Sequence, residues 1–172
     1  MKQLFASVLC LAACLALTGC FGKDSEVDLN AMMGDIEAAY GDDWLANSEM
    51  SQSVFENEFG LEGSLVDSYV GRMPMTGNHP DRVLLIKATK DNGEAVEQAL
   101  RKRLNEMIAD ATQNPDHTAK LNSARVVRNG DYVGLLMVGA EDTVSGDDKD
   151  AALQFAKDQV KKAEDVFHGA FQ

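Results

Sequence analysis

Cysteine is scarce in this sequence of 172 residues, and none occurs after position 20. The three cysteines are Cys10, Cys14 and Cys20. Beyond position 20 the chain therefore offers no disulfide, and no thiolate for nucleophilic chemistry or metal binding. We expect the stability of the remaining residues to come from packing alone.

Positive charge is also in short supply. Lysine and arginine number 16 against 28 aspartates and glutamates, which gives a formal net charge of −12 at pH 7. Nucleic acid needs lysine and arginine to neutralise its phosphates, and anionic lipid headgroups attract basic segments. The composition therefore argues against nucleic acid as a partner and against direct contact with anionic lipid. Solubility is a sufficient reason for the acidity.

The longest uncharged apolar stretch is too short to cross a membrane comfortably. It runs from Leu4 to Leu17 after the single cation Lys2, whereas a membrane-spanning helix needs ~20 apolar residues. A charged start, a short apolar middle and small residues at the end are typical of a secretory signal. We therefore expect residues 1–19 to be a signal peptide.

The signal ends in Leu17-Thr18-Gly19-Cys20, which resembles the bacterial lipobox. This resemblance implies a diacylglyceryl group on the sulfur of Cys20 and cleavage between Gly19 and Cys20. The alternative is a secreted protein without lipid, cut elsewhere, for example after Ala16. Residues 20–26 then form a short polar tether, and residues 27–172 form a single globular domain.

Apolar residues at helical spacing predict four helices, at residues 27–40, 51–59, 94–112 and 147–168. Gly41 and Gly60 are expected to end the first two helices, and Ser51 to cap the second. Trp44, the only tryptophan, should pack against the first helix. The last helix should begin near Asp147 or Asp148, whose charge suits the positive end of a helix.

Runs rich in apolar residues predict four strands, at residues 65–75, 82–89, 124–128 and 131–138. Asn129-Gly130 joins the last two and predicts a hairpin with a type I′ turn. After two short helices the order is strand, strand, helix, strand, strand, helix. The sequence therefore predicts an α+β fold, with a four-stranded, largely antiparallel sheet and both long helices packed on one face.

One segment has a recognisable resemblance. Tyr69-Val70-Gly71-Arg72-Met73-Pro74-Met75, followed by Asn78 and the strand at 82–88, resembles a family of short bacterial lipoproteins, mainly from Gram-positive, clostridial-type bacteria. Their shared domain has no known function. The resemblance covers residues 32–167 and implies an exported, lipid-anchored, single-domain protein. It implies no reaction and no cofactor.

The Met73-Pro74-Met75 segment has two interpretations. The structural one is a pair of core methionines flanking a proline that ends a strand at the edge of the sheet. The functional one is an adaptable binding rim or a thioether site for copper. No histidine or further methionine lies in the same segment, which favours the structural interpretation.

Residues that could bind a metal are dispersed along the chain. His79, His117 and His168 lack the spacing of a zinc site, so we expect each to be a separate surface histidine. Asp147-Asp148-Lys149-Asp150 lacks the alternating acids and closing glutamate of a calcium loop, which favours a capped, acidic helix start. We expect no metal.

Three functions are compatible with this sequence. The first, which we favour, is a binding or accessory module for an unknown protein or small molecule at the outer face of the membrane. The second is an extracytoplasmic hydrolase with Asp42, Asp43 or Asp142 as acid and base, which would require two carboxylates with separated pKa values. The third is a structural protein of the envelope or spore. No nucleophile motif is present, so we expect no catalytic residue.

Overall fold

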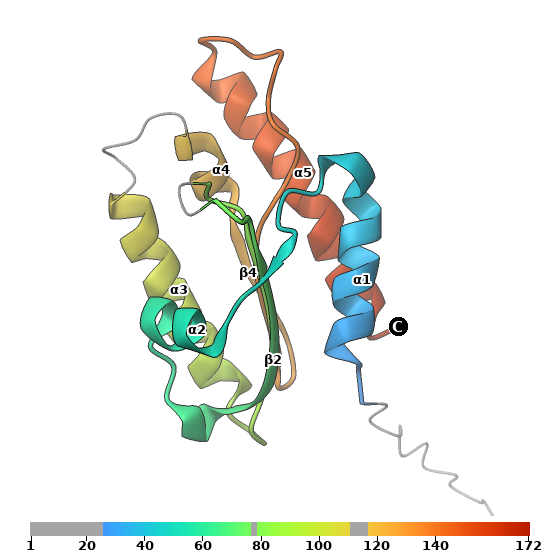
Figure 1. Cartoon of the computed structure of the whole chain (residues 1–172), viewed down its shortest axis with the longest axis vertical. Helices are drawn as coiled ribbons and strands as arrows, with labels where there is room; N and C mark the ends of the chain where they lie inside the picture. Colours follow the sequence, from blue (N-terminus) through green and yellow to red (C-terminus); the bar gives the residue numbers. More distant parts are fainter. Residues whose placement is uncertain (1–25, 77–78, 111–116) are drawn as a thin grey trace, which may run out of the picture.

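The computed structural model describes residues 26–76, 79–110 and 117–172. A five-stranded antiparallel sheet stands between two layers of helices (Figure 1). The strands are β1 (Ser48–Glu49), β2 (Val66–Met73), β3 (Arg82–Ala88), β4 (Arg125–Asn129) and β5 (Tyr132–Met137), in the spatial order β1-β2-β3-β5-β4. The α-helices are α1 (Leu29–Tyr40), α2 (Gln52–Phe59), α3 (Gly93–Asp110), α4 (Thr118–Ser123) and α5 (Lys149–Gly169). Two short 3₁₀ helices are η1 (Gly41–Asp43) and η2 (Gly63–Leu65).

The predicted helix ends are confirmed by their caps. Gly41 and Gly60 follow α1 and α2 with positive φ angles of 54° and 57°, a region that glycine enters without strain. The Ser51 side chain accepts the N–H of Val54 at the start of α2. Local sequence chemistry therefore decides where these helices begin and end.

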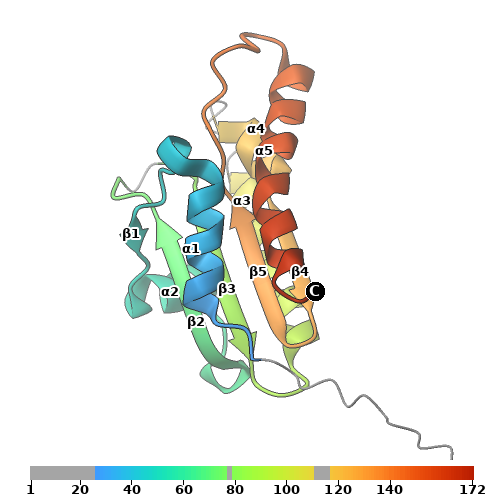
Figure 2. The same cartoon turned by 90° about the vertical axis from the view of Figure 1, so that its right-hand side faces the viewer.

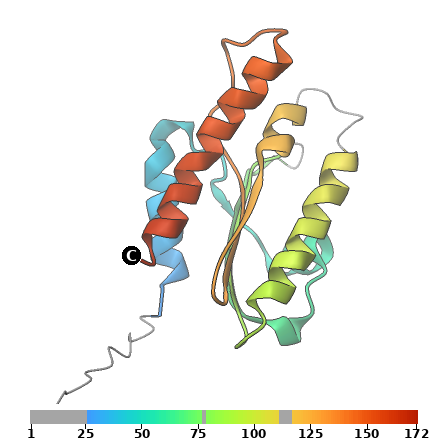
Figure 3. The same ribbon diagram turned by 180° about the vertical axis from the view of Figure 1, so that it is seen from behind.

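The strands β3 and β5 are buried on both faces, and this organises the two cores. Toward one face, alternate residues such as Leu84 and Leu135 pack with α2, α3 and α4. Toward the other, Leu85 and Leu136 pack with α1 and α5. Figure 3 shows α3 on one side of the sheet and α5 on the other.

The expectation that both long helices share one face is therefore wrong. A strand that is apolar at every position exposes a hydrophobic row on each side, and each row needs its own cover. Here α3 covers one row, and α5 covers the other together with α1. The Tyr40 hydroxyl of α1 donates to the Gln159 carbonyl of α5 at 2.8 Å, which ties these two helices together.

The sheet also has a fifth strand, where four were predicted. The two residues of β1 pair with the end of β2, Ser48 with Met73 and Glu49 with Arg72. The Arg72 guanidinium contacts the Glu49 carboxylate at 3.1 Å. Two polar residues carry no strand periodicity, so only the neighbouring strand creates this one. The short helix α4 is also absent from the sequence prediction.

The predicted hairpin forms, but with a different turn. Asn129 pairs with Tyr132, so Gly130 and Asp131 are the two central residues. Of the four residues 129–132, only Gly130 has a positive φ, 58°, which matches the φ pattern of a type II′ turn and not of type I′. The Asp131 carboxylate accepts the backbone N–H groups of Asp91 and Gly93 at 3.0 and 3.1 Å. The turn is thereby joined to the start of α3.

Gly93 lies against this turn so closely that a side chain would not fit. A Cβ atom at Gly93 would stand 2.2 Å from the Gly130 carbonyl oxygen. We expect Gly93→Ala to lower the unfolding free energy by about 1–3 kcal/mol, because backbone atoms must shift. Urea unfolding of the full chain measures the change.

Gly34 in α1 provides the matched control, because a Cβ there would meet no atom within 4 Å. Gly34→Ala should raise the unfolding free energy by about 0.5–1 kcal/mol through its better helix propensity. Equal effects of the two substitutions would contradict the proposed clash.

Candidate functional site

Two hollows open at opposite ends of the sheet. The first, of about 810 Å³, lies beside the end of β3 and the β4–β5 turn, and its lining includes Lys87 and Tyr132. The second, of about 850 Å³, lies between α4, the loop after β5 and the start of α5. His79, which precedes β3, lines the second hollow. Figure 2 shows α5 running past the end of the sheet at this second end.

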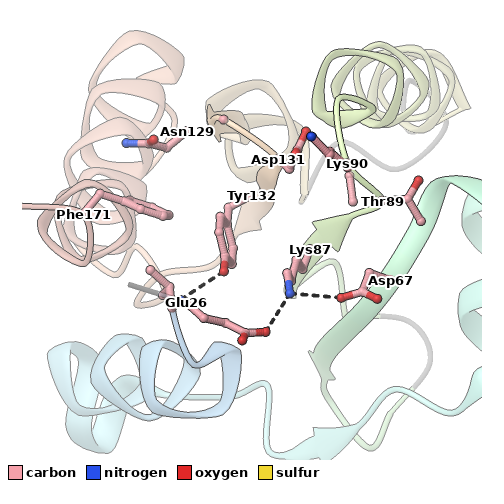
Figure 4. Close-up of a pocket in the computed structure, with 12 residues that line it drawn as sticks. Glu26, Asp67, Lys87, Thr89, Lys90, Asn129, Asp131, Tyr132 and Phe171 are labelled. Atoms are coloured by element: carbon pink, nitrogen blue, oxygen red, sulfur yellow. Dashed lines mark hydrogen bonds and ion pairs between the residues drawn. The ribbon is translucent and has the colours of Figure 1, made fainter. Parts of the chain in front are cut away.

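The first hollow contains a small ion-pair network (Figure 4). The Lys87 ammonium lies 2.6 Å from the Glu26 carboxylate and 3.1 Å from that of Asp67. These hydrogen bonds, the one to Glu26 most of all, raise the pKa of Lys87 above its ordinary value. The Val27 N–H donates to the Tyr132 hydroxyl at 3.0 Å. These contacts of Glu26 and Val27 therefore hold the first described residues against the end of the sheet.

The second hollow combines charged and apolar residues from three elements. The histidines and charged residues of its lining are His79, His117, Lys120, Glu141, Asp142, Asp147, Lys149 and Asp150. Its apolar lining includes Leu153, Phe155 and Ala156 of α5. A hollow with an apolar side and several convergent polar groups is the usual form of a ligand site, so we take this one as the candidate.

A buried carboxylate lies behind the second hollow. Asp81 immediately precedes β3 and has no exposed surface. The Lys120 ammonium of α4 lies 2.7 Å from its Oδ1 and also donates to the Gly139 carbonyl at 2.8 Å. Beyond this ion pair, neither oxygen of Asp81 has a hydrogen bond of good geometry. Burial raises the pKa of Asp81, although Lys120, His79 and the Gly139 backbone act in the opposite direction.

Arg82 holds the backbone of this segment in position. Its side chain donates to the carbonyl oxygens of His79 and Asp81 at 2.9 and 2.7 Å. The guanidinium also contacts the Glu58 carboxylate of α2 at 3.3 Å. The backbone at His79 and Asp81 is therefore held by Arg82, the first residue of β3, which Glu58 of α2 contacts in turn.

His79 stands between two carboxylates. Its Nδ1 accepts the Asp81 N–H at 3.3 Å and lies 3.5 Å from the Asp81 carboxylate. Its Nε2 lies 3.4 Å from the Glu141 carboxylate. The His117 ring lies beside that of His79, with ring centroids 5.7 Å apart.

The prediction of three separate surface histidines is wrong for this pair, and the side chain of His79 is only 17% exposed. His79 precedes β3 and His117 precedes α4, with β3 and α3 between them, so no short spacing in the sequence relates them. His168 does lie apart, near the end of α5, against Phe167. Within residues 26–76, 79–110 and 117–172, no three His, Cys, Asp or Glu side chains are arranged to hold a metal ion.

The carboxylates named for a hydrolase are exposed. Asp42 and Asp43 lie in η1 and do not line the second hollow, whereas Asp142 does. Asp142 accepts hydrogen bonds from Ser145 and the Val144 backbone, which lower its pKa. The sequence did not single out the groups that do converge here, Asp81, Lys120 and Glu141.

The structure confirms the predicted start of α5 but only part of the interpretation of Met73-Pro74-Met75. Asp148 accepts the N–H groups of Asp150 and Ala151 and caps α5, which confirms the capped helix start. In the Met-Pro-Met segment Met73 packs against the core and Pro74 is buried, but Met75 is 82% exposed. The expectation of two core methionines is wrong for Met75, because the strand ends at Met73. Gly19 and Cys20 lie outside the described residues.

Removing the cation from the buried ion pair tests its role. Lys120→Met keeps the apolar stem and leaves a buried carboxylate without its partner, which typically costs about 3–5 kcal/mol of unfolding free energy. The pKa of folded Asp81 then rises further above its unfolded value of ~3.9. Because the folded state binds this proton more tightly, stability falls as pH rises between the two pKa values and stays low above them. We expect the deficit to grow as the pH rises above the unfolded value of ~3.9, as measured by urea unfolding.

The double variant Asp81→Asn/Lys120→Met is the control, because it removes the titrating group as well. Its difference from the single variant Asp81→Asn, which also lacks that group, should not depend on pH in this range. A Lys120→Met deficit that is the same at every pH would contradict the assignment to Asp81.

Comparison with known families places the whole five-stranded sheet within one family model. The match covers residues 40–138, from the last residue of α1 to the residue after β5. Asp81 and Lys120 lie inside this range, and α5 lies beyond it. No curated protein and no solved structure matches the chain. The chain belongs to the family described as a domain of unknown function, DUF4358.

Proposed function

We propose that this protein is a lipid-anchored binding or accessory module at the outer, extracytoplasmic face of the cell membrane. The observation that carries the proposal is Leu17-Thr18-Gly19-Cys20 at the end of a short apolar stretch. Cys20 accepts a diacylglyceryl group through a thioether and becomes the first residue after cleavage. Each buried methylene contributes ~0.8 kcal/mol, and two acyl chains hold a protein stably where one holds it marginally.

The proposed anchor also sets an orientation. The span from Cys20 to Glu26 is six residues, which reach at most about 21 Å when extended. Glu26 is paired with Lys87 near the end of β3, while the second hollow lies at the start of β3. In this orientation the second hollow points away from the membrane, where a partner can reach it. None of the helices in the described residues has the length and apolarity to span a bilayer.

Binding is favoured over hydrolysis by the contents of the second hollow. The carboxylates Asp42, Asp43 and Asp142 are all exposed, and Asp142 has a lowered pKa. A general acid needs the opposite shift. Asp81 is the carboxyl whose pKa is raised, but it is fully buried behind the hollow and paired with Lys120. A hollow with fixed polar groups and an apolar side is suited to holding a ligand.

The anchor is tested by replacing its only proposed acceptor. Cys20→Ser should abolish incorporation of labelled fatty acid and release the protein from the membrane fraction, because serine offers no thiol for the thioether. Growth with labelled palmitate, followed by gel electrophoresis and fractionation, measures both effects.

Cys14→Ser is the matched control, since Cys14 lies in the same stretch but outside the proposed motif. This variant should incorporate label as the parent protein does. Undiminished labelling of the Cys20→Ser variant would refute the proposed anchor.

A further inference from the structure

We propose that the second hollow binds a short, positively charged segment of a partner protein that also presents an apolar side chain. This inference rests on the proposed function as a binding module and names the chemistry of its ligand. Three observations carry it: acidic groups without ion-pair partners, a lining with fewer uncompensated lysines than exposed carboxylates, and an apolar surface outside both cores.

The first observation is negative charge without compensation. Asp147 and Asp150 line the hollow, are exposed, and have no ion-pair partner in the part of the chain that the structure describes. Asp142 adds a third exposed carboxylate from the adjoining loop. Like charges gathered on one surface attract a ligand of the opposite sign and speed its association.

The second observation concerns the lysines of the lining, Lys120 and Lys149. Lys120 is held by the buried Asp81 and the Gly139 carbonyl, so its charge is already compensated inside the domain. Lys149 is exposed, and it is the one lysine of the lining left to balance Asp142, Asp147 and Asp150. The field in the hollow is therefore negative and favours lysine or arginine from a partner.

The third observation is apolar surface that belongs to neither core. Leu153 and Phe155 lie in the first turns of α5, which extend past the end of the sheet (Figure 2). Both are half-buried, both line the hollow, and neither packs in either core cluster. Val144, in the loop next to the lining residue Thr143, is 81% exposed. These side chains would gain from an apolar group of the ligand.

Together these features select a basic, amphipathic peptide segment over a simple cation. The acids lie on two separate elements, the loop after β5 and the start of α5, so they suit more than one positive group. The apolar side chains lie on the same α5 turns that follow Asp150. A ligand with lysine or arginine next to a leucine-like residue can contact the carboxylates and the apolar side chains at the same time.

Fluorescence anisotropy tests the chemistry with the full chain in detergent, with empty micelles as the blank. The probes are three labelled peptides of equal length, built from lysine and leucine, lysine and serine, or glutamate and leucine. We expect the lysine–leucine peptide to bind at least about tenfold more tightly than either counterpart, and to weaken as salt screens the charges. Equal binding of the lysine–serine peptide, or of spermine as competitor, would overturn the apolar part of the proposal.

Matched variants locate the binding site. Asp147→Asn/Asp150→Asn should weaken binding of the lysine–leucine peptide about tenfold. Leu153→Ser should weaken it to a similar extent while leaving every charge of the protein in place. Asp35→Asn/Glu37→Gln removes the same charge from exposed positions on α1 and should change nothing. Equal weakening by the two double variants would show general acidity and overturn the site. These variants leave Cys20 untouched, so failure of peptide binding refutes the ligand class while fatty-acid labelling still decides the anchor.

Discussion

The constraint on which this fold depends is the burial of β3 and β5 on both faces. These neighbouring strands are apolar at nearly every position, and each face exposes a row of side chains that must be covered. Helix α3 covers one row, and α1 with α5 covers the other. The short strand β1 and the described loops lie around this three-layered centre.

The candidate site follows from how the layers end. Helix α4 belongs to the same core as α3, and α5 to the opposite one, yet both meet at the end of the sheet where β3 begins. Asp81 and His79 lie at that junction, and Lys120 reaches Asp81 from α4. A buried ion pair is often no more stabilising than apolar residues of the same volume. Here the ion pair lies behind a hollow lined by two histidines, whereas the described lining of the first hollow contains no histidine.

Sequence reasoning succeeded where local chemistry decides the structure. Glycine with a positive φ ends α1 and α2, Ser51 and Asp148 cap their helices, and Trp44 packs beside Tyr40 at 6.0 Å between ring centroids. It failed where a distant element decides. β1 exists only because β2 lies beside it, and the Gly130–Asp131 turn takes its form while joined to the start of α3. The histidine pair could not be foreseen, because α3 separates His79 from His117 along the chain.

The sequence by itself determined the α+β class, most helix ends, the central position of β3, and the signal-like segment that ends in Cys20. These depend on hydrophobic period, backbone preference and short motifs, which are local properties. The tertiary structure alone decided which face of the sheet each long helix covers. An amphipathic pattern shows which side of a helix is buried, but it does not specify the face of the sheet against which that side packs. It also decided that Asp81, Lys120, His79 and Glu141 meet, since contacts between residues far apart in the chain depend on the packing of the whole domain.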